Sequence, residues 1–166
     1  MKKNVLLAVL LLSLPALAKS KIEYKPLLHQ TILYFASDRI TTGGFGMGAG
    51  VQIIYKEHFV AQTDASLLWA NGNAISTRLA LGCQRRGTWT PSIMGTLGLL
   101  WGQRTEILDD RGRRPTSPVW VVGLRAAMLR FANERGCLSA LEAGYGVGPY
   151  RGSCLELTIL SAGIKW

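Results

Sequence analysis

Cysteine and histidine are scarce in this chain, and their scarcity excludes several kinds of site. The three cysteines, Cys83, Cys137 and Cys154, cannot all pair within the chain, and their spacing fits neither a zinc site nor a dense disulfide framework. We expect buried or lipid-facing thiols, with one disulfide as the alternative in an oxidising compartment. The chain also lacks a Gly-rich phosphate loop, a metal-ligand cluster and a nucleic-acid motif. We therefore expect no cofactor, no metal and no nucleic-acid partner.

Long apolar runs are missing after the first 18 residues. Lys2 and Lys3 open the chain, a largely apolar run covers residues 5–14, and Ala16 and Ala18 stand at the spacing that a signal peptidase accepts. Residues 5–18 fall short of the roughly 20 that a membrane-spanning helix needs. We expect residues 1–18 to be a cleaved signal peptide and residues 19–166 to form one domain without a helical anchor. No cysteine follows the cleavage site, which argues against a lipid-modified N-terminus.

Acidic residues are few, at 10 against 19 lysines and arginines, which gives a formal charge of +9. Loss of Lys2 and Lys3 with the signal peptide lowers this charge by two, to +7. On an exported protein such an excess favours anionic lipid or lipopolysaccharide as a neighbour over nucleic acid. The alternative is that the arginines occupy solvated turns.

Alternation of apolar residues with small or polar residues is frequent in this sequence, and residues 43–55 show it most clearly. Phe45, Met47 and Val51 fall on one side of this segment, whereas Gly44, Gly46, Gly48 and Gly50 fall on the other. Because a strand sends successive side chains to opposite faces, this segment is predicted to be a strand between two different environments. Residues 27–36 alternate poorly, but the same two-sided pattern recurs over residues 59–69, 74–84, 89–102, 120–128, 141–148 and 154–166.

Eight strands joined mostly by tight turns predict one closed sheet, since an even number of antiparallel strands can seal without edges. The alternation extends over about 9 to 13 residues per strand. Tilted strands that cross a membrane need about 9 to 11 residues. The predicted fold class is therefore all-β, an eight-stranded antiparallel up-and-down transmembrane β-barrel.

Large aromatic residues decide which face meets lipid, because they stand at strand ends on the apolar face. Threading the chain up and down places four at each end of the predicted barrel. One rim carries Tyr55, Phe59, Trp89 and Trp166, and the other carries Phe45, Trp69, Trp101 and Trp120. Two aromatic girdles around an apolar band are typical of the two membrane interfaces. In a soluble barrel the tryptophans would lie in the middle of the core.

Charges on the polar face predict two ion pairs inside the barrel. Asp64 lies opposite Arg78 if the intervening turn is centred on Asn71. Arg125 lies opposite Glu142 if the later hairpin turns between Asn133 and Glu134. Charges in mid-strand are tolerated where they are paired in the interior. A one-residue error in either turn would separate its pair.

An exported chain with girdled alternating strands and a final segment Leu160, Ala162, Ile164, Trp166 resembles the small eight-stranded outer-membrane β-barrel proteins of Gram-negative-type bacteria. The resemblance implies that the last strand is similar to the signal read by the barrel-assembly machinery. It also implies that the short turns face the periplasm and that the charged loop over residues 105–118 faces outside. Outer-membrane lipid and lipopolysaccharide would then be the neighbours of a monomeric barrel.

Three functions remain open. The first is a non-enzymatic barrel with an envelope-structural or surface-interaction role, or its variant, a narrow pore for small amphiphiles beside the interior glycines. The second is a lipid A or phospholipid acyl hydrolase or transferase, but no serine stands two residues from His29 or His58, so the local His-x-Ser arrangement of the deacylases is missing. The third is contact of lipopolysaccharide phosphates with Arg111, Arg113 and Arg114 in the long loop.

Overall fold

The structure is a computed structural model, and it describes residues 22–70, 73–102, 105–106 and 118–164. The predicted signal peptide, Trp166 and the three loop arginines Arg111, Arg113 and Arg114 lie outside these residues. No helix in the described part of the chain is long and apolar enough to cross a membrane.

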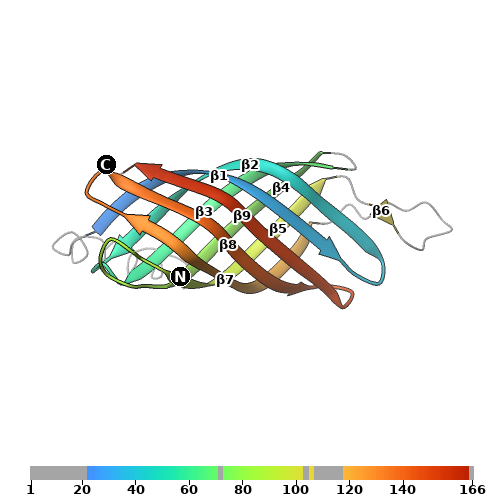
Figure 1. The fold of residues 1–166 in the computed structure, drawn as a ribbon. Helices are drawn as coiled ribbons and strands as arrows, with labels where there is room; N and C mark the ends of the chain where they lie inside the picture. The colour runs from blue at the N-terminus through green and yellow to red at the C-terminus, as the bar shows by residue number, and fades with distance from the viewer. Residues whose placement is uncertain (1–21, 71–72, 103–104, 107–117, 165–166) are drawn as a thin grey trace, which may run out of the picture.

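Eight long antiparallel strands form one closed barrel, which confirms the predicted fold class (Figure 1). They are β1 (Ile22–Ala36), β2 (Ile40–Tyr55), β3 (Phe59–Ala70), β4 (Asn73–Gln84), β5 (Ser92–Gly102), β7 (Val119–Ala132), β8 (Gly136–Gly148) and β9 (Gly152–Ile164). Each strand pairs with its neighbour in the chain, and pairing of β1 with β9 closes the sheet. A two-residue strand, β6 (Thr105–Glu106), adds to the start of β2.

Two ends of the barrel can be named from their connections. The short-turn rim holds the turns at residues 56–58, 85–91 and 133–135, and the long-loop rim is the opposite end, with the turns at residues 37–39 and 149–151 and the strand ends Ala70, Asn73, Gly102 and Val119. At the short-turn rim the Asn133 side chain accepts hydrogen bonds from the backbone N–H groups of Arg135 and Gly136, both at 2.9 Å. An asparagine that satisfies two N–H groups in this way fixes a tight turn.

Several predicted strand limits were wrong, among them the start of β2 at Ile40 rather than residue 43 and the end of β7 at Ala132 rather than residue 128. β1 begins at Ile22 rather than residue 27, and β8 begins at Gly136 rather than residue 141. β5 begins at Ser92, so Trp89 precedes it and pairs with Phe131 through an isolated bridge. The indole N–H of Trp89 donates to the carbonyl of Met128 at 2.8 Å, which holds the ring at this rim.

The strands carry apolar side chains outward and small or polar side chains inward. On β2, Phe45 and Met47 are exposed while Gln52 is completely buried. β1 follows the same rule, although its inward positions mix His29 and Thr31 with Leu33 and Phe35, all buried. That mixture explains why the alternation of β1 is hard to see in the sequence.

A row of irregular positions crosses three neighbouring strands. Met128 on β7, Leu141 on β8 and Ile159 on β9 lie side by side and drop out of the regular pairing. The register against β1 shifts at this row, and Leu141 has a positive φ of 53°. An extra residue in a strand reverses which face each later side chain occupies. Met128 and Leu129 accordingly both point outward, as do Ile159 and Leu160.

The aromatic residues predicted as girdles are described for seven of the eight positions. Phe45, Trp69 and Trp120 are exposed at the long-loop rim, where Trp101 is half-buried. Phe59 and Trp89 are exposed at the short-turn rim, beside a half-buried Tyr55. Rings pack across strands at both rims, with Phe45 and Trp69 6.2 Å apart and Tyr55 and Phe59 6.3 Å apart between centroids.

All three cysteines are free thiols. Cys83 is exposed on the outer face of β4, Cys137 is half-buried on β8, and Cys154 is buried on β9. The alternative of a disulfide is therefore not what the structure contains.

Candidate functional site: the charged lumen

The interior of the barrel, here called the lumen, is filled with side chains in three zones. An apolar cluster closes it at the long-loop rim, formed by Leu33, Phe35, Ile40, Leu68, Ala74, Leu100, Val119, Val121 and Cys154. Charged and amide side chains occupy the middle, and a cavity opens at the short-turn rim. An eight-stranded barrel encloses just enough space for side chains to fill, so such packing is what the strand number allows.

Phe35 is the largest side chain of the apolar cluster and is completely buried. Its ring rests against Gly148 and Gly152, where a Cβ atom would come within 2.7 and 2.1 Å of ring carbons. The two glycines therefore provide the space that lets one aromatic ring close this end of the lumen.

Asp64 and Arg78 form an ion pair in the middle of the lumen. They are directly opposite on β3 and β4, and an Arg78 Nη atom lies 2.7 Å from Asp64 Oδ1. The Nε–H of Arg78 donates to Asp64 Oδ2 at 3.3 Å, so the guanidinium forms two hydrogen bonds with the carboxylate. Arg78 also contacts Glu156 on β9, across the lumen.

Arg125 and Glu142 are in contact, but the predicted register was wrong. Arg125 lies opposite Gly144, and Glu142 lies opposite Ala127. The long Arg125 side chain reaches Glu142 diagonally, with a hydrogen bond between them. The physical reason is that the hairpin turn of residues 133–135 sits one residue further along than expected, which moves every partner by two.

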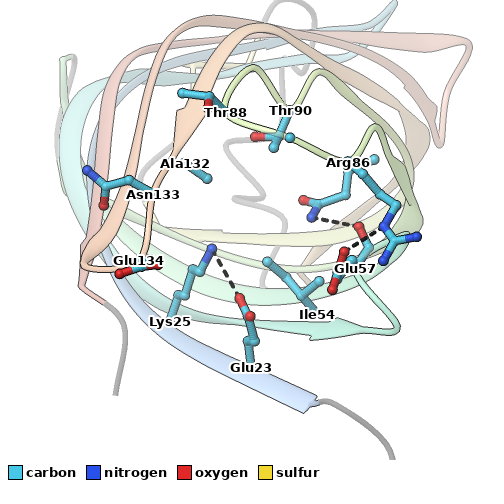
Figure 2. A pocket seen from close by; sticks show the side chains of 12 residues that line it. Glu23, Lys25, Ile54, Glu57, Arg86, Thr88, Thr90, Ala132, Asn133 and Glu134 are labelled. Carbon is cyan, nitrogen blue, oxygen red and sulfur yellow. Dashed lines mark hydrogen bonds and ion pairs between the residues drawn. The ribbon is translucent and has the colours of Figure 1, made fainter.

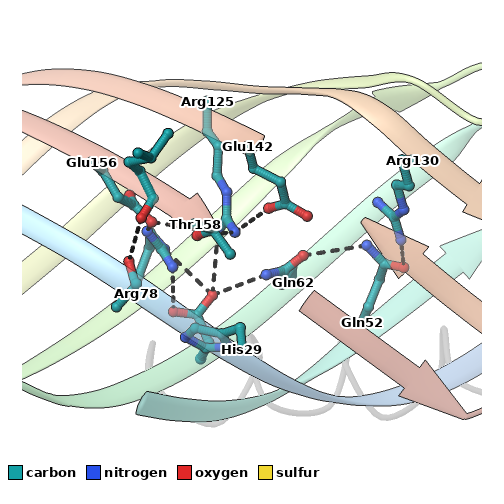
Figure 3. Close-up of polar contacts among 12 residues, drawn as sticks. His29, Gln52, Gln62, Arg78, Arg125, Arg130, Glu142, Glu156 and Thr158 are labelled. Atoms are coloured by element: carbon teal, nitrogen blue, oxygen red, sulfur yellow. Dashed lines mark hydrogen bonds and ion pairs between the residues drawn. The ribbon is translucent and has the colours of Figure 1, made fainter. Parts of the chain in front are cut away.

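Arg125 is the centre of the lumen network (Figure 3). Its side chain is 1% exposed and lies 3.7 Å from the Asp64 carboxylate and 3.8 Å from that of Glu156. It also donates to the Thr158 hydroxyl at 3.1 Å. One guanidinium therefore joins carboxylates from β3, β8 and β9.

A chain of amides extends the network toward the short-turn rim. Gln62 donates to Asp64 at 3.0 Å, and Gln52 donates to Gln62 at 3.3 Å. Arg130 donates in turn to the Gln52 side-chain oxygen. The middle of the lumen is thus one connected set of polar groups running from Glu156 to Arg130, as Figure 3 shows.

Sequence reasoning missed several members of this network for two reasons. Arg130, Glu156 and Thr158 lie beyond the irregular row at Met128 and Ile159, where the faces reverse, so simple alternation assigns them outward. Gln52 and Gln62 do lie on the predicted polar face, but their side-chain amides are uncharged, so no partner of opposite charge can be inferred for them. A search for one-residue shifts in alternation would have found the first group.

His29 and Ser66 are also joined in the lumen, although β2 separates their strands. His29, Gly48 and Ser66 stand in one row across β1, β2 and β3. His29 Nε2 lies 2.9 Å from Ser66 Oγ, directly over Gly48, where a Cβ atom would come within 2.4 Å of both. Gly144 stands in a similar row between Arg125 and Glu156. Interior glycines therefore open corridors through which side chains of non-adjacent strands meet.

A histidine beside a serine is the arrangement of acyl transfer, but this pair lacks two further requirements. Ser66 is 4% exposed inside a packed lumen, and the other ring nitrogen of His29, which a carboxylate should orient, has no hydrogen-bond partner in the described chain. The contact satisfies two buried polar groups. The residues that the structure describes contain no group of three or more His, Cys, Asp or Glu able to hold a metal.

Comparison with solved structures shows which barrels this one resembles. Ail of Yersinia pestis, solved in complex with the heparin analogue sucrose octasulfate, matches with a TM-score of 0.51 and 12% identity over 87% of this chain and 99% of Ail. Neisserial surface protein A matches with a TM-score of 0.57 and 10% identity over 86% of this chain and 97% of that one. The chain has the fold of the small eight-stranded outer-membrane β-barrels. No protein-family model matches the sequence, and no curated protein matches it.

Proposed function

We propose that this eight-stranded barrel is a non-enzymatic outer-membrane protein with a packed polar lumen and an envelope-structural or surface-interaction role. The observation that carries the proposal is the distribution of charge between the two faces of one sheet. Arg78, Arg125, Asp64 and Glu142 are at most 7% exposed, while large apolar side chains cover the outside of every long strand. A barrel in water would be built with these two faces exchanged.

The contents of the lumen favour a plug over a pore. The apolar cluster at the long-loop rim and the ion-paired centre lie one behind the other along the barrel, so water has no continuous polar path. An enzymatic role has one point in its favour, the His29–Ser66 contact at 2.9 Å. The burial of Ser66 favours the interpretation that this contact stabilises the packed lumen.

Export and partners belong to the same proposal. A cleaved signal peptide over residues 1–18, insertion by the barrel-assembly machinery and a monomeric state in outer-membrane lipid are what the sequence pattern supports. The long-loop rim would face outside, where Arg111, Arg113 and Arg114 would meet lipopolysaccharide phosphates. In the described part of that rim Arg39 stacks over the Tyr150 ring at 4.9 Å, which adds a further cation beside Arg151.

A folded barrel with a packed lumen is expected to migrate faster on a gel before heating than after, and to conduct no ions. Protein refolded in detergent should show the gel shift, because a closed sheet resists the detergent until it is boiled. The same sample in a planar bilayer should leave the current at the level of the bare membrane. A single band at both temperatures would contradict the barrel, and steady conductance steps would contradict the plugged lumen.

Tryptophan fluorescence is expected to be quenched most strongly by lipids that carry bromine near the headgroup. Trp69, Trp89 and Trp120 are exposed on the outer face at the two rims, the depth at which indole rings settle in a bilayer. Bromine at the ends of the acyl chains should quench less, and unbrominated lipid is the control. Strong quenching by aqueous iodide together with none by either brominated lipid would show that the outer face meets water.

A further inference from the structure

The cavity at the short-turn rim is separate from the charged centre of the lumen. Its volume is about 330 Å³, and its walls include Lys25, Ile54, Thr90 and Glu134. Figure 2 looks into this opening and shows side chains from opposite walls pointing toward the space. The volume is enough for a molecule of the size of a dipeptide.

The cavity is closed at its inner end. Lys25 stands opposite Gln52 on the neighbouring strand, and Gln52 is held by Arg130 on one side and Gln62 on the other. Beyond them come the ion pairs and the apolar cluster with its completely buried Phe35. A molecule that enters from the short-turn rim can therefore bind but not pass through.

The inner end of the cavity holds two buried cations, Lys25 and Arg130. Lys25 is 2% exposed and forms an ion pair with Glu23, whose carboxylate lies 3.6 Å from Nζ, longer than a good hydrogen bond. Arg130 is 3% exposed, donates to the neutral Gln52 and interacts electrostatically with Glu142, while its Nε has no hydrogen-bond partner in the described chain. A buried cation whose ion pair is long gains from a closer anion, so an anionic group from outside would be stabilised beside Lys25.

Thr90 gives independent support for a ligand at this depth. It lines the cavity and is 3% exposed, and its hydroxyl has no hydrogen-bond partner within the described chain. Its backbone N–H donates to the Arg130 carbonyl at 2.8 Å, which fixes its position next to that arginine. A buried hydroxyl is normally hydrogen-bonded, and a bound carboxylate would accept from it.

The opening of the cavity carries negative charge. Glu134 is exposed there and forms no ion pair with any described residue. Across the opening Glu57 binds Arg86 at 2.5 Å, a hydrogen bond that raises the pKa of Arg86 (Figure 2). Since Glu57 pairs with Arg86 and Glu23 pairs with Lys25, Glu134 is the carboxylate of the described lining that can attract a cation at the entrance.

We propose that this cavity is a blind binding pocket for a small zwitterion such as a dipeptide, whose carboxylate binds Lys25 and the Thr90 hydroxyl while its ammonium group binds Glu134. The separation of a positive inner end from a negative entrance sets the direction in which the ligand enters. If the short-turn rim faces the periplasm, the pocket samples periplasmic peptides or amino acids and not molecules outside the cell.

Calorimetric titration of the refolded full chain with alanyl-alanine tests the pocket, with the C-terminal amide and the N-acetyl form as comparison ligands. The free dipeptide should bind, and the amide should bind at least about tenfold more weakly, the equivalent of about 1.4 kcal/mol. Lys25→Met should weaken the free dipeptide by a similar factor, and Thr90→Val by several-fold. Glu134→Gln should weaken the free dipeptide but not its N-acetyl form.

Matched variants control for general damage. Lys56→Met removes a lysine in the turn outside the cavity, and Thr63→Val makes the same change as Thr90→Val on the outer face of β3. Both should bind like the parent, and all variants should keep the gel shift of a folded barrel. Absence of dipeptide binding to the parent, equal binding of acid and amide, or unchanged binding by both Lys25→Met and Thr90→Val would overturn the proposal.

Discussion

Replacing Arg125 with methionine is expected to lower the free energy of unfolding by about 3–5 kcal/mol, the usual cost of removing one partner from a buried ion pair. Arg125 contacts Glu142 and lies within 3.8 Å of Asp64 and Glu156. Methionine fills much of the space but removes one cation from three buried carboxylates, leaving Arg78 beside Asp64 and Glu156 and the electrostatic interaction of Arg130 with Glu142. The loss should appear in urea unfolding of the protein in lipid vesicles, followed by tryptophan fluorescence.

The charge explanation for Arg125 can be separated from a packing explanation. Adding Glu142→Gln to Arg125→Met removes one uncompensated carboxylate and should restore part of the lost stability, since the two sites are coupled. Arg86→Met, which breaks an exposed ion pair at the rim, should leave stability unchanged. A double variant as unstable as the sum of its single variants would contradict the network.

The sequence predicts the fold so well because two solvents act on one sheet. On β2, β3 and β4 most outward residues are apolar and most inward residues are small or polar, with Ile40, Ile54, Val60 and Leu68 as the inward exceptions, so period-two alternation gives strand and face. The turn between β3 and β4 was correctly placed, and Asp64 therefore stands opposite Arg78 as expected from counting.

Counting by twos fails where the alternation of apolar and polar residues no longer indicates whether a side chain points into the lumen or outward. On β1 the inward positions Leu33 and Phe35 are apolar because they belong to the cluster that fills the long-loop rim. On β7 and β9 an added residue reverses the faces, which hides Arg130 and Glu156 from a count by twos. Both failures have one cause. Which side chains fill a small barrel depends on contacts between strands, and the residue order within one strand does not show those contacts.

The cavity at the short-turn rim could not be predicted for a similar reason. Lys25 lies before the predicted start of the first strand, and Thr90 lies in the connection that precedes β5. Both line the cavity because β1 begins at the rim that also holds the β4–β5 connection, an arrangement that closure of the sheet produces. Neither residue has a sequence neighbour that reveals the other.

Some interior glycines make room for contacts between side chains of non-adjacent strands, so replacing one of these should destabilise the barrel. Gly48→Ala is expected to cost about 1–3 kcal/mol, the range for overpacking a filled interior. The added Cβ atom would come within 2.4 Å of both His29 Nε2 and Ser66 Oγ, so the two polar groups must separate. A buried group that loses its hydrogen bond adds to this cost. Urea unfolding in lipid vesicles measures the effect.

Gly98→Ala provides a matched control, because Gly98 also faces the lumen but its nearest neighbours would lie 3.6 and 3.9 Å from the new Cβ atom. That variant should be as stable as the parent or slightly more so, since alanine restricts the unfolded chain. Ser66→Ala breaks the same hydrogen bond as Gly48→Ala, so the double variant should lose less stability than the sum of the two single variants. Strict additivity would show that Gly48 serves the backbone alone, and equal costs at Gly48 and Gly98 would contradict the corridor between β1 and β3.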